Sequence, residues 1–250
     1  MLLYFHNKIN PLKGGNIMHK KLQEEKLKLI VDTIQKGVYL AEVKMGSLGL
    51  YDKNGLGLFS LNFIFKALRE YTNDEFAVVQ FKRGPFEMVF LYDAETKTLI
   101  TFTSQNNAKR LQQRVAIKKP HYNDAFVLYN ASWFEEPQQL CLFSDETETQ
   151  RQKIYQDIEY KINSLDISQH VMICYDIKYK SFLLQGIELQ MYSPHYYLIY
   201  KEDLRKYISH DFELGISTHG NSDSGDEGKA RKSKNKFNLA EKIAANQKEG

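Results

Sequence analysis

Cysteine is scarce in this sequence, which has two in 250 residues, Cys141 and Cys174. Two cysteines supply neither the disulfide framework of a small secreted domain nor the ligand set of a structural zinc site, and their scarcity fits a reducing, cytoplasmic compartment. Long apolar runs are lacking as well. A membrane-spanning helix needs about 18 consecutive apolar residues, and no segment has them, so no membrane partner is predicted.

The common catalytic and cofactor motifs are also missing. The sequence has no His-Glu-x-x-His, Gly-x-Ser-x-Gly, Cys-x-x-Cys or Gly-x-Gly-x-x-Gly segment and no lysine-terminated phosphate loop. Its seven histidines are scattered, and only His121 has neighbours suited to acid–base chemistry. We therefore predict no cofactor and favour a role other than catalysis.

The chain does contain enough apolar sequence for a substantial core. It is 42% hydrophobic, which allows one or two domains. Its 16 Tyr and 15 Phe favour sheet over a helical bundle. A net charge of +3 and a pI near 8.6 are mildly basic and do not by themselves indicate a nucleic-acid partner.

The N-terminal region predicts a leader and two helices. Residues 1–17 lack the apolar centre of a secretory signal, and Lys13-Gly14-Gly15 before Met18 is what a translated ribosome-binding sequence would encode, so we expect a leader without a fold. Apolar residues at intervals of three and four predict a helix over 19–35 that Gly37 ends. After a glycine-dotted loop, a second helix is expected over 58–71.

Two later stretches each predict three strands between helices. Strands over 76–81, 86–92 and 98–103 are separated by good turns and followed by a helix over 105–113. A helix over 149–165 precedes strands over 171–175, 182–191 and 196–200 and a helix over 202–208. The halves share a turn pattern, Tyr92-Asp93 and Tyr175-Asp176, which is explained equally by internal duplication or by the frequency of Asp in turns.

The predicted fold class is therefore α+β, with two helix-flanked antiparallel three-stranded meander units. The first unit spans 18–134, an exposed linker spans 135–148, and the second unit spans 149–212. Residues 213–250 lose apolar patterning and pass from acidic to basic, which predicts a disordered tail. Its Arg231 and Lys232 are either weak DNA contacts or part of a solubilising end.

The linker carries a short apolar cluster in a polar setting. Gln139-Leu140-Cys141-Leu142-Phe143 follows Glu135-Glu136-Pro137 and precedes Ser144-Asp145-Glu146. The cluster resembles the linear motif with which bacterial polymerases, repair proteins and some phage proteins bind the DNA sliding clamp, with Cys141 in place of a serine or aspartate. The resemblance implies that Leu140, Leu142 and Phe143 fill an apolar pocket while Gln139 fixes the register. A buried hairpin or loop plug is the alternative.

Basic residues at the first strand turn and around the end of the helix over 105–113 are a weaker candidate for a binding site. Lys82, Arg83, Arg114, Lys118 and Lys119, together with Arg110, are candidates for one phosphate-binding patch. The alternative, which we favour, is an ordinary solvated helix end in which Asp124 caps the next helix.

A metal-dependent nuclease is a further alternative. Such enzymes place two carboxylates and a lysine on adjacent strands to bind magnesium and activate water. The candidates are Asp176 with Glu188, or Glu87 with Asp93 and Lys82. However, Gln190 stands where the lysine is needed after Glu188, and both aspartates are placed as turn residues.

The section 76–124, with Phe81-Lys82-Arg83-Gly84-Pro85-Phe86-Glu87 and Lys119-Pro120-His121-Tyr122-Asn123-Asp124, is similar to an uncharacterised family of Gram-positive bacteria and their mobile elements. That resemblance implies the kind of genome in which the protein is encoded, but it implies no mechanism. We predict a cytoplasmic, DNA-replication-associated interaction protein, encoded by a phage or mobile element, that binds the sliding clamp. The alternatives are a clamp-recruited nuclease and a defence or regulatory protein without clamp contact.

Overall fold

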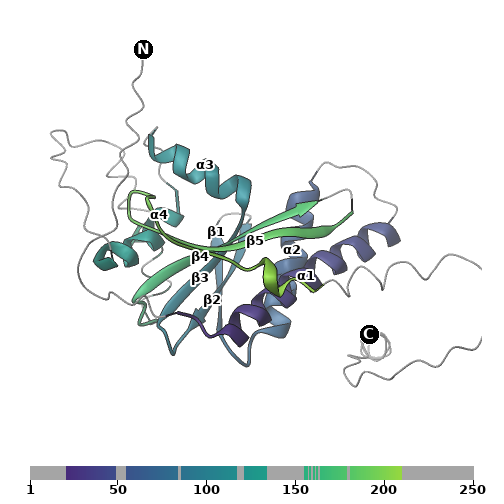
Figure 1. Ribbon diagram of the computed structural model, residues 1–250, viewed down its shortest axis with the longest axis horizontal. Helices are drawn as coiled ribbons and strands as arrows, with labels where there is room; N and C mark the ends of the chain where they lie inside the picture. The colour runs from purple at the N-terminus through teal and green to yellow at the C-terminus, as the bar shows by residue number, and fades with distance from the viewer. Residues whose placement is uncertain are drawn as a thin grey trace, which may run out of the picture. The chain divides into compact units, whose positions relative to one another are not determined.

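The computed structural model describes residues 21–48, 55–83, 86–116, 121–133, 164–178 and 181–209, together with residues 155, 156, 158, 160 and 162. All of them belong to one compact unit that ends at Ser209. Their elements, in chain order, are α1 (Glu24–Ser47), α2 (Leu56–Tyr71), β1 (Ala77–Arg83), β2 (Phe86–Asp93), β3 (Thr98–Ser104), α3 (Gln105–Ala116), α4 (Asn123–Val127), the 3-10 helix η1 (Leu128–Trp133), β4 (Gln169–Lys178), β5 (Leu183–Tyr192), β6 (Leu198–Asp203) and the 3-10 helix η2 (Arg205–Tyr207) (Figure 1).

The six strands form one mixed sheet in the order β1-β2-β3-β4-β5-β6. Each half is an antiparallel meander, and the two meanders join through the parallel pair β3–β4. Parallel neighbours need a crossover connection, and here it contains α3, α4 and η1. The predicted α+β class is confirmed, and the two predicted units share a single sheet.

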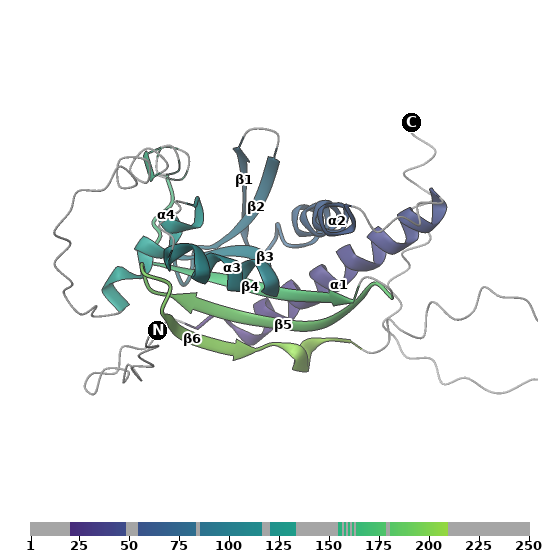
Figure 2. The same ribbon diagram turned by 90° about the horizontal axis from the view of Figure 1, so that it is seen from above.

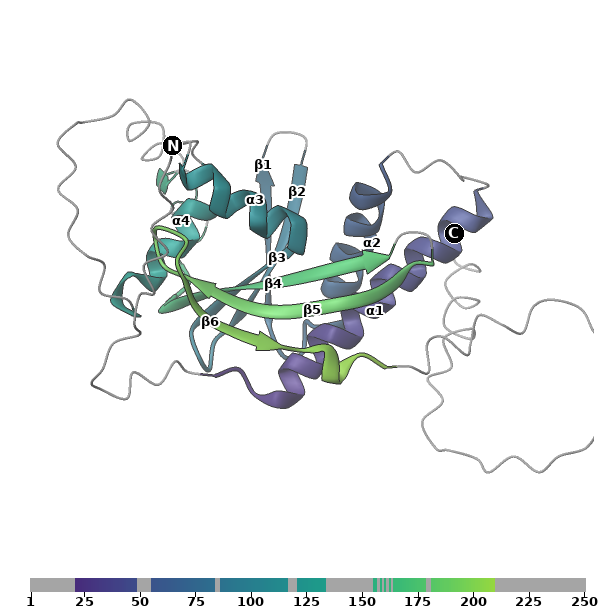
Figure 3. The same cartoon turned by 45° about the horizontal axis from the view of Figure 1, so that its top comes forward.

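Alternation along the strands divides the sheet into two faces. Ile100 lies beside Leu91 on one side and Val171 on the other, and these three side chains belong to the large core that includes α1 and α2. The opposite face carries Met172 and Cys174, which pack with residues of α3, α4 and the β5–β6 turn. Figures 2 and 3 show α2 beside α1 and the β1–β2 hairpin, and α3 beside β3 and β4.

The prediction that Gly37 ends the first helix is wrong. Helix α1 continues through Gly37 to Ser47. A Cβ atom at Gly37 would lie 2.6 Å from Ile64 Cα and 2.9 Å from Ile64 N, so the glycine lets the backbones of α1 and α2 touch. A glycine in a helix interior costs roughly 1 kcal/mol relative to alanine, and here it permits close packing that no other residue allows.

The predicted helix over 202–208 is also wrong. Residues Leu198–Asp203 instead form the edge strand β6, and only Arg205–Tyr207 are helical. The register runs from Tyr192 opposite Leu198 to Glu188 opposite Asp203, so pairing with β5 extends the strand past its predicted end at residue 200. At the other end Tyr196, predicted as the first strand residue, lies in the preceding turn at φ 60°.

The other predicted elements of the described chain are present with shifted ends. Helix α2, strands β1 to β5 and helix α3 match the predicted ranges to within a few residues. Of the helix expected over 149–165, the described residues are helical up to Ile162, and Ile158 and Ile162 are buried in the large core. The leader 1–17, the linker 135–148 and the tail 213–250 lie outside the described residues.

The fold does not show an internal duplication. Asp93 ends β2 and faces α1, where Lys26 contacts it. Asp176 lies within β4, opposite Gly186 on the face shared with α3. The two aspartates that suggested a repeat therefore occupy different places in their strands and opposite faces of the sheet.

Candidate functional site

The clamp motif, Gln139, Leu140, Leu142 and Phe143, lies outside the described residues. Its position in the chain is nevertheless defined, because it falls in the β3–β4 crossover between Trp133 and Tyr155. On the N-terminal side the indole Nε1 of Trp133 donates a hydrogen bond to the Ser168 carbonyl oxygen at 3.1 Å. On the C-terminal side the chain re-enters the core at Ile158. Both ends of the motif-bearing segment are thus attached to the body.

Asn130 fixes the end of η1 that leads into this segment. Its side chain is fully buried. Its Nδ2 donates to the carbonyl oxygens of His170 at 2.9 Å and Tyr192 at 2.8 Å, and its Oδ1 accepts from His170 N at 2.8 Å. The β4–β5 ladder ends at Met172–Gln190, and continuing its register by two residues brings His170 opposite Tyr192, the two residues that Asn130 bridges. A side-chain amide therefore takes over where the two strands separate, and sequence reasoning missed it.

His121, the histidine with the most suggestive neighbours, is part of the turn that begins α4. Its backbone N–H donates to Asp124 Oδ2 at 2.8 Å, and its Nδ1 accepts from Asn123 N at 3.2 Å. The second carboxylate oxygen of Asp124 accepts from the Tyr196 hydroxyl at 2.9 Å. Burial, followed by the charge of Asp124, raises the pKa of Tyr196. The prediction that Asp124 caps the helix is wrong, because α4 begins at Asn123 and its N-cap, Tyr122, makes no side-chain capping hydrogen bond. Asp124 instead anchors the preceding turn and the β5–β6 turn to α4.

His170 is a buried neutral histidine on the crossover face. Its Nε2 lies 2.9 Å from Thr101 Oγ1, and its ring packs 5.6 Å from that of Phe126. Burial lowers the pKa of His170 to about 3 from its ordinary 6.5, because the imidazolium would be desolvated. The residue therefore supplies packing and one hydrogen bond.

Because the folded chain does not protonate His170 until the pH is far below 6.5, we expect the free energy of unfolding to fall in acid. The unfolded chain binds the histidine proton below pH 6.5 and the folded chain does not, so stability falls as pH drops below 6.5, by about 1.4 kcal/mol per pH unit. We expect urea unfolding of the wild type to lose about 3 kcal/mol more than His170→Gln between pH 7 and pH 4.5. The exposed His195→Gln is the matched control. An equal acid response in the wild type and His170→Gln would contradict the assignment.

The nuclease candidates Asp176 and Glu188 lie on adjacent strands and the same face, as predicted. Cys174 faces Glu188 across the ladder, and Asp176 faces Gly186. Each carboxylate already has protein partners: Gln185 Nε2 donates to Asp176 at 2.8 Å, whereas Lys201 Nζ is 2.7 Å from Glu188. Among the described residues, no group of three or more His, Cys, Asp or Glu side chains could hold a metal ion.

The alternative set, Glu87 with Asp93 and Lys82, is spread along the hairpin. Lys82 and Glu87 face each other near its tip, and Glu87 pairs with Arg69 of α2 at 3.0 Å. Asp93 stands at the other end of β2, buried against Lys26 at 2.6 Å. The three residues therefore do not converge on one point.

A buried polar network beside Glu188 escaped sequence reasoning. Cys174 Sγ lies 3.1 Å from Gln190 Oε1, which also accepts a short hydrogen bond from the Tyr192 hydroxyl. Gln190 Nε2 donates to Glu188 at 2.7 Å. Burial, with a smaller contribution from Glu188, raises the pKa of the Cys174 thiol. A protonated, buried thiol is unreactive, so this network is structural.

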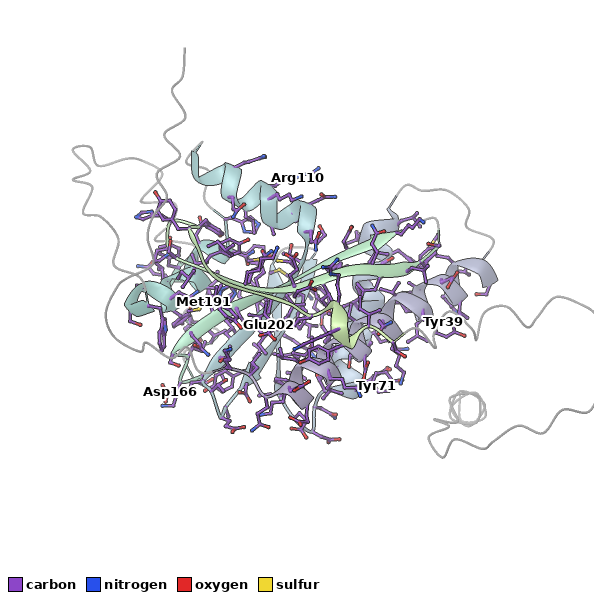
Figure 4. All side chains as sticks on the ribbon, viewed as in Figure 1. Tyr39, Tyr71, Arg110, Asp166, Met191 and Glu202 are labelled. Carbon is purple, nitrogen blue, oxygen red and sulfur yellow. The ribbon has the colours of Figure 1, made fainter. Side chains whose placement is uncertain are left out.

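The predicted basic residues are only partly within the described chain. Lys82 lies exposed on β1, whereas Lys118, Lys119, Arg231, Lys232 and the side chains of Arg83 and Arg114 lie outside the described part. Arg110 projects from α3 (Figure 4), and Lys109 beside it is exposed as well. Sequence reasoning did not single out Lys109, although its spacing from Ala108 and Leu111 could have shown that it points outward.

A comparison with family models decides the membership of the chain. Residues 19–250 match the model of a family of unknown function, DUF5986. The chain belongs to this family. The predicted membership of a family without an assigned activity is thereby confirmed, whereas clamp binding and the source of the chain stay predictions. No curated protein and no solved structure matches it. In the part of this DUF5986 member that the structure describes, the helices are too short or too polar to cross a membrane.

Proposed function

We propose that this protein binds the bacterial DNA sliding clamp through Gln139, Leu140, Leu142 and Phe143, and acts in the cytoplasm as a replication-associated interaction protein encoded by a phage or other mobile element. The observation that carries the proposal is the pentapeptide itself. Three apolar side chains with a preceding glutamine, between acidic and proline-containing flanks, suit capture by a preformed apolar pocket.

The attachment of the segment at both ends supports this role. Residues 134–154 lie between Trp133, held by Ser168, and the buried Ile158. A fully extended chain spans about 3.4 Å per residue, so a segment of this length fixed at both ends could carry its midpoint at most roughly 35 Å from the body. Such a reach is enough to enter a pocket on a partner while the folded unit stays outside it.

Binding would act through competition. The clamp pocket accepts one motif at a time, so an occupied pocket excludes any polymerase or repair protein that uses the same motif. The fraction of clamp blocked then depends on the concentration of this protein relative to its dissociation constant. Recruitment of the folded unit to the replication fork is the second consequence of the same contact.

The test is calorimetry of the full chain with its host clamp, beside Leu142→Ala/Phe143→Ala and the matched control Gln138→Ala. We expect micromolar or tighter binding by the wild type and the control. Removing two buried apolar side chains of an anchor costs about 4 kcal/mol, which is about a thousandfold in affinity.

Folding of the variant separates the two interpretations of the segment. If it is an exposed binding peptide, the double variant keeps the circular dichroism spectrum and thermal midpoint of the wild type. A folded wild-type chain that does not bind the clamp would refute the proposal. A double variant that is strongly destabilised would instead favour the buried plug.

A further inference from the structure

Helix α3 presents a polar, cationic face away from the sheet. Ala108 and Leu111 are buried against Met172 and Cys174 of β4, which fixes the orientation of the helix. The residues exposed on the opposite side are all amides or cations: Asn106, Asn107, Lys109, Arg110, Gln112 and Gln113. Figure 4 shows Arg110 on this outer side.

The charge of this region is one-sided. The sequence contains no acidic residue from Thr96 to Asn123 but six basic ones, Lys97, Lys109, Arg110, Arg114, Lys118 and Lys119. An ordinary solvated helix surface mixes both signs, often as pairs four residues apart, as Lys66 and Glu70 do on α2. Helix α3 has no such acid.

The two described cations of α3 are not held by carboxylates. Lys26, Arg69, Lys201 and Arg205 form ion pairs, whereas Lys28 and Lys44 of α1 form none among the described residues. Within the part of the chain that the structure describes, neither Lys109 nor Arg110 forms one. Because a paired cation must give up its partner before it binds another anion, Lys109 and Arg110 are the more available for an external polyanion.

We infer that the outer face of α3 binds the phosphate backbone of duplex DNA. Lys and Arg contact phosphates, and Asn and Gln side chains donate further hydrogen bonds to phosphate and sugar oxygens. A helix of this length extends about 18 Å, enough to follow several successive phosphates. The choice of DNA as the polyanion rests on the proposed function, because a clamp-bound protein is held beside DNA, and the crossover that carries the clamp motif also contains α3.

The test measures affinity for a fluorescein-labelled 20-base-pair duplex by anisotropy, without clamp, between 50 mM and 300 mM NaCl. The chains are the wild type, Lys109→Ala/Arg110→Ala and the control Lys28→Ala/Lys66→Ala. The control removes the same charge from exposed positions of α1 and α2, on the other face of the sheet. All replaced side chains are exposed, and alanine favours helix, so the variants keep the fold.

Loss of two phosphate contacts reduces the slope of log affinity against log salt by about 1.8. At 0.1 M salt that difference corresponds to about 60-fold weaker binding if the two proteins bind equally at 1 M. We expect this loss in Lys109→Ala/Arg110→Ala and less than a threefold change in the control.

Equal affinity and salt slope in both variants would assign any DNA binding to other basic residues and overturn the inference. A wild-type chain that does not bind the duplex at 50 mM NaCl would also overturn it. Leu142→Ala/Phe143→Ala should bind the duplex as the wild type does. A failure of DNA binding and a failure of clamp binding are therefore observed separately.

Discussion

Replacing Lys26 by methionine is expected to destabilise the fold by about 3–5 kcal/mol, because the change leaves the Asp93 carboxylate buried without its cation. The Lys26 ammonium lies 2.6 Å from Asp93, and the side chains of the two are 10% and 1% exposed. Methionine keeps the length and apolar packing of the lysine stem, so the expected loss comes from the charge and its hydrogen bonds.

The surroundings of Asp93 explain why it is charged despite its burial. Burial alone would raise its pKa, but the hydrogen bond from Lys26 and those from the Thr96 side chain and backbone outweigh burial, and the pKa is lowered. Burial likewise acts to lower the pKa of Lys26, and Asp93 and Glu95 reverse the direction. The pair ties the start of α1 to the β2–β3 turn, where Thr96 N donates to Asp93 at 3.1 Å.

The measurement is urea unfolding at pH 7 of Lys26→Met, Asp93→Asn and the double variant. Asparagine keeps an acceptor for Thr96 and removes the charge, so the double variant should recover part of the loss caused by Lys26→Met. The control is Glu95→Gln, since Glu95 also contacts Lys26, at 3.1 Å, but has a side chain 57% exposed. Its effect should stay below about 1 kcal/mol. A Lys26→Met loss as small as that of the control would show that the pair contributes little.

Local sequence patterns predicted the elements of this fold better than the contacts between them. Strands β1 to β3 are apolar-rich runs bounded by strong turn signals, so their ranges could be predicted. The role of Gly37 could not, because a glycine that ends a helix and one that admits a second helix look the same until Ile64 is placed beside it. The parallel β3–β4 pair, which makes one sheet of two meanders, also depends on long-range contacts.

The same division holds for the candidate sites. The clamp motif is a local pattern, and the sequence alone proposes it. The nuclease candidates needed a three-dimensional test, because adjacency of Asp176 and Glu188 was predictable, whereas their existing partners Gln185 and Lys201 come from other positions in the sheet. The α3 face combines both levels: the acid-free stretch is visible in the sequence, and the structure shows that Lys109 and Arg110 face outward and form no ion pair with another described residue.

Replacing Asn130 by leucine should destabilise the protein by about 3–6 kcal/mol. The change leaves three buried backbone groups, the His170 N–H and the carbonyl oxygens of His170 and Tyr192, without the partner that Asn130 provides. A buried group left unsatisfied costs about 1–3 kcal/mol, whereas leucine adds little packing in a site shaped for an amide. The comparison is urea unfolding beside Asn107→Leu, which replaces an exposed asparagine on α3 and should change stability by less than about 0.5 kcal/mol.

Asn130→Asp tests whether the amide stabilises the fold through its N–H donors or through its shape, because aspartate keeps the shape and lacks the donors. Aspartate preserves the acceptor for His170 N but turns a second acceptor toward two carbonyl oxygens, so at pH 7 it should be at least as destabilising as leucine. Protonation of the carboxyl restores one donor, and the deficit relative to the wild type at the same pH should shrink as the pH is lowered. A deficit that is independent of pH would mean that the carboxyl leaves the strand junction, and a leucine variant within 1 kcal/mol of the wild type would show that β4 and β5 hold the crossover without Asn130.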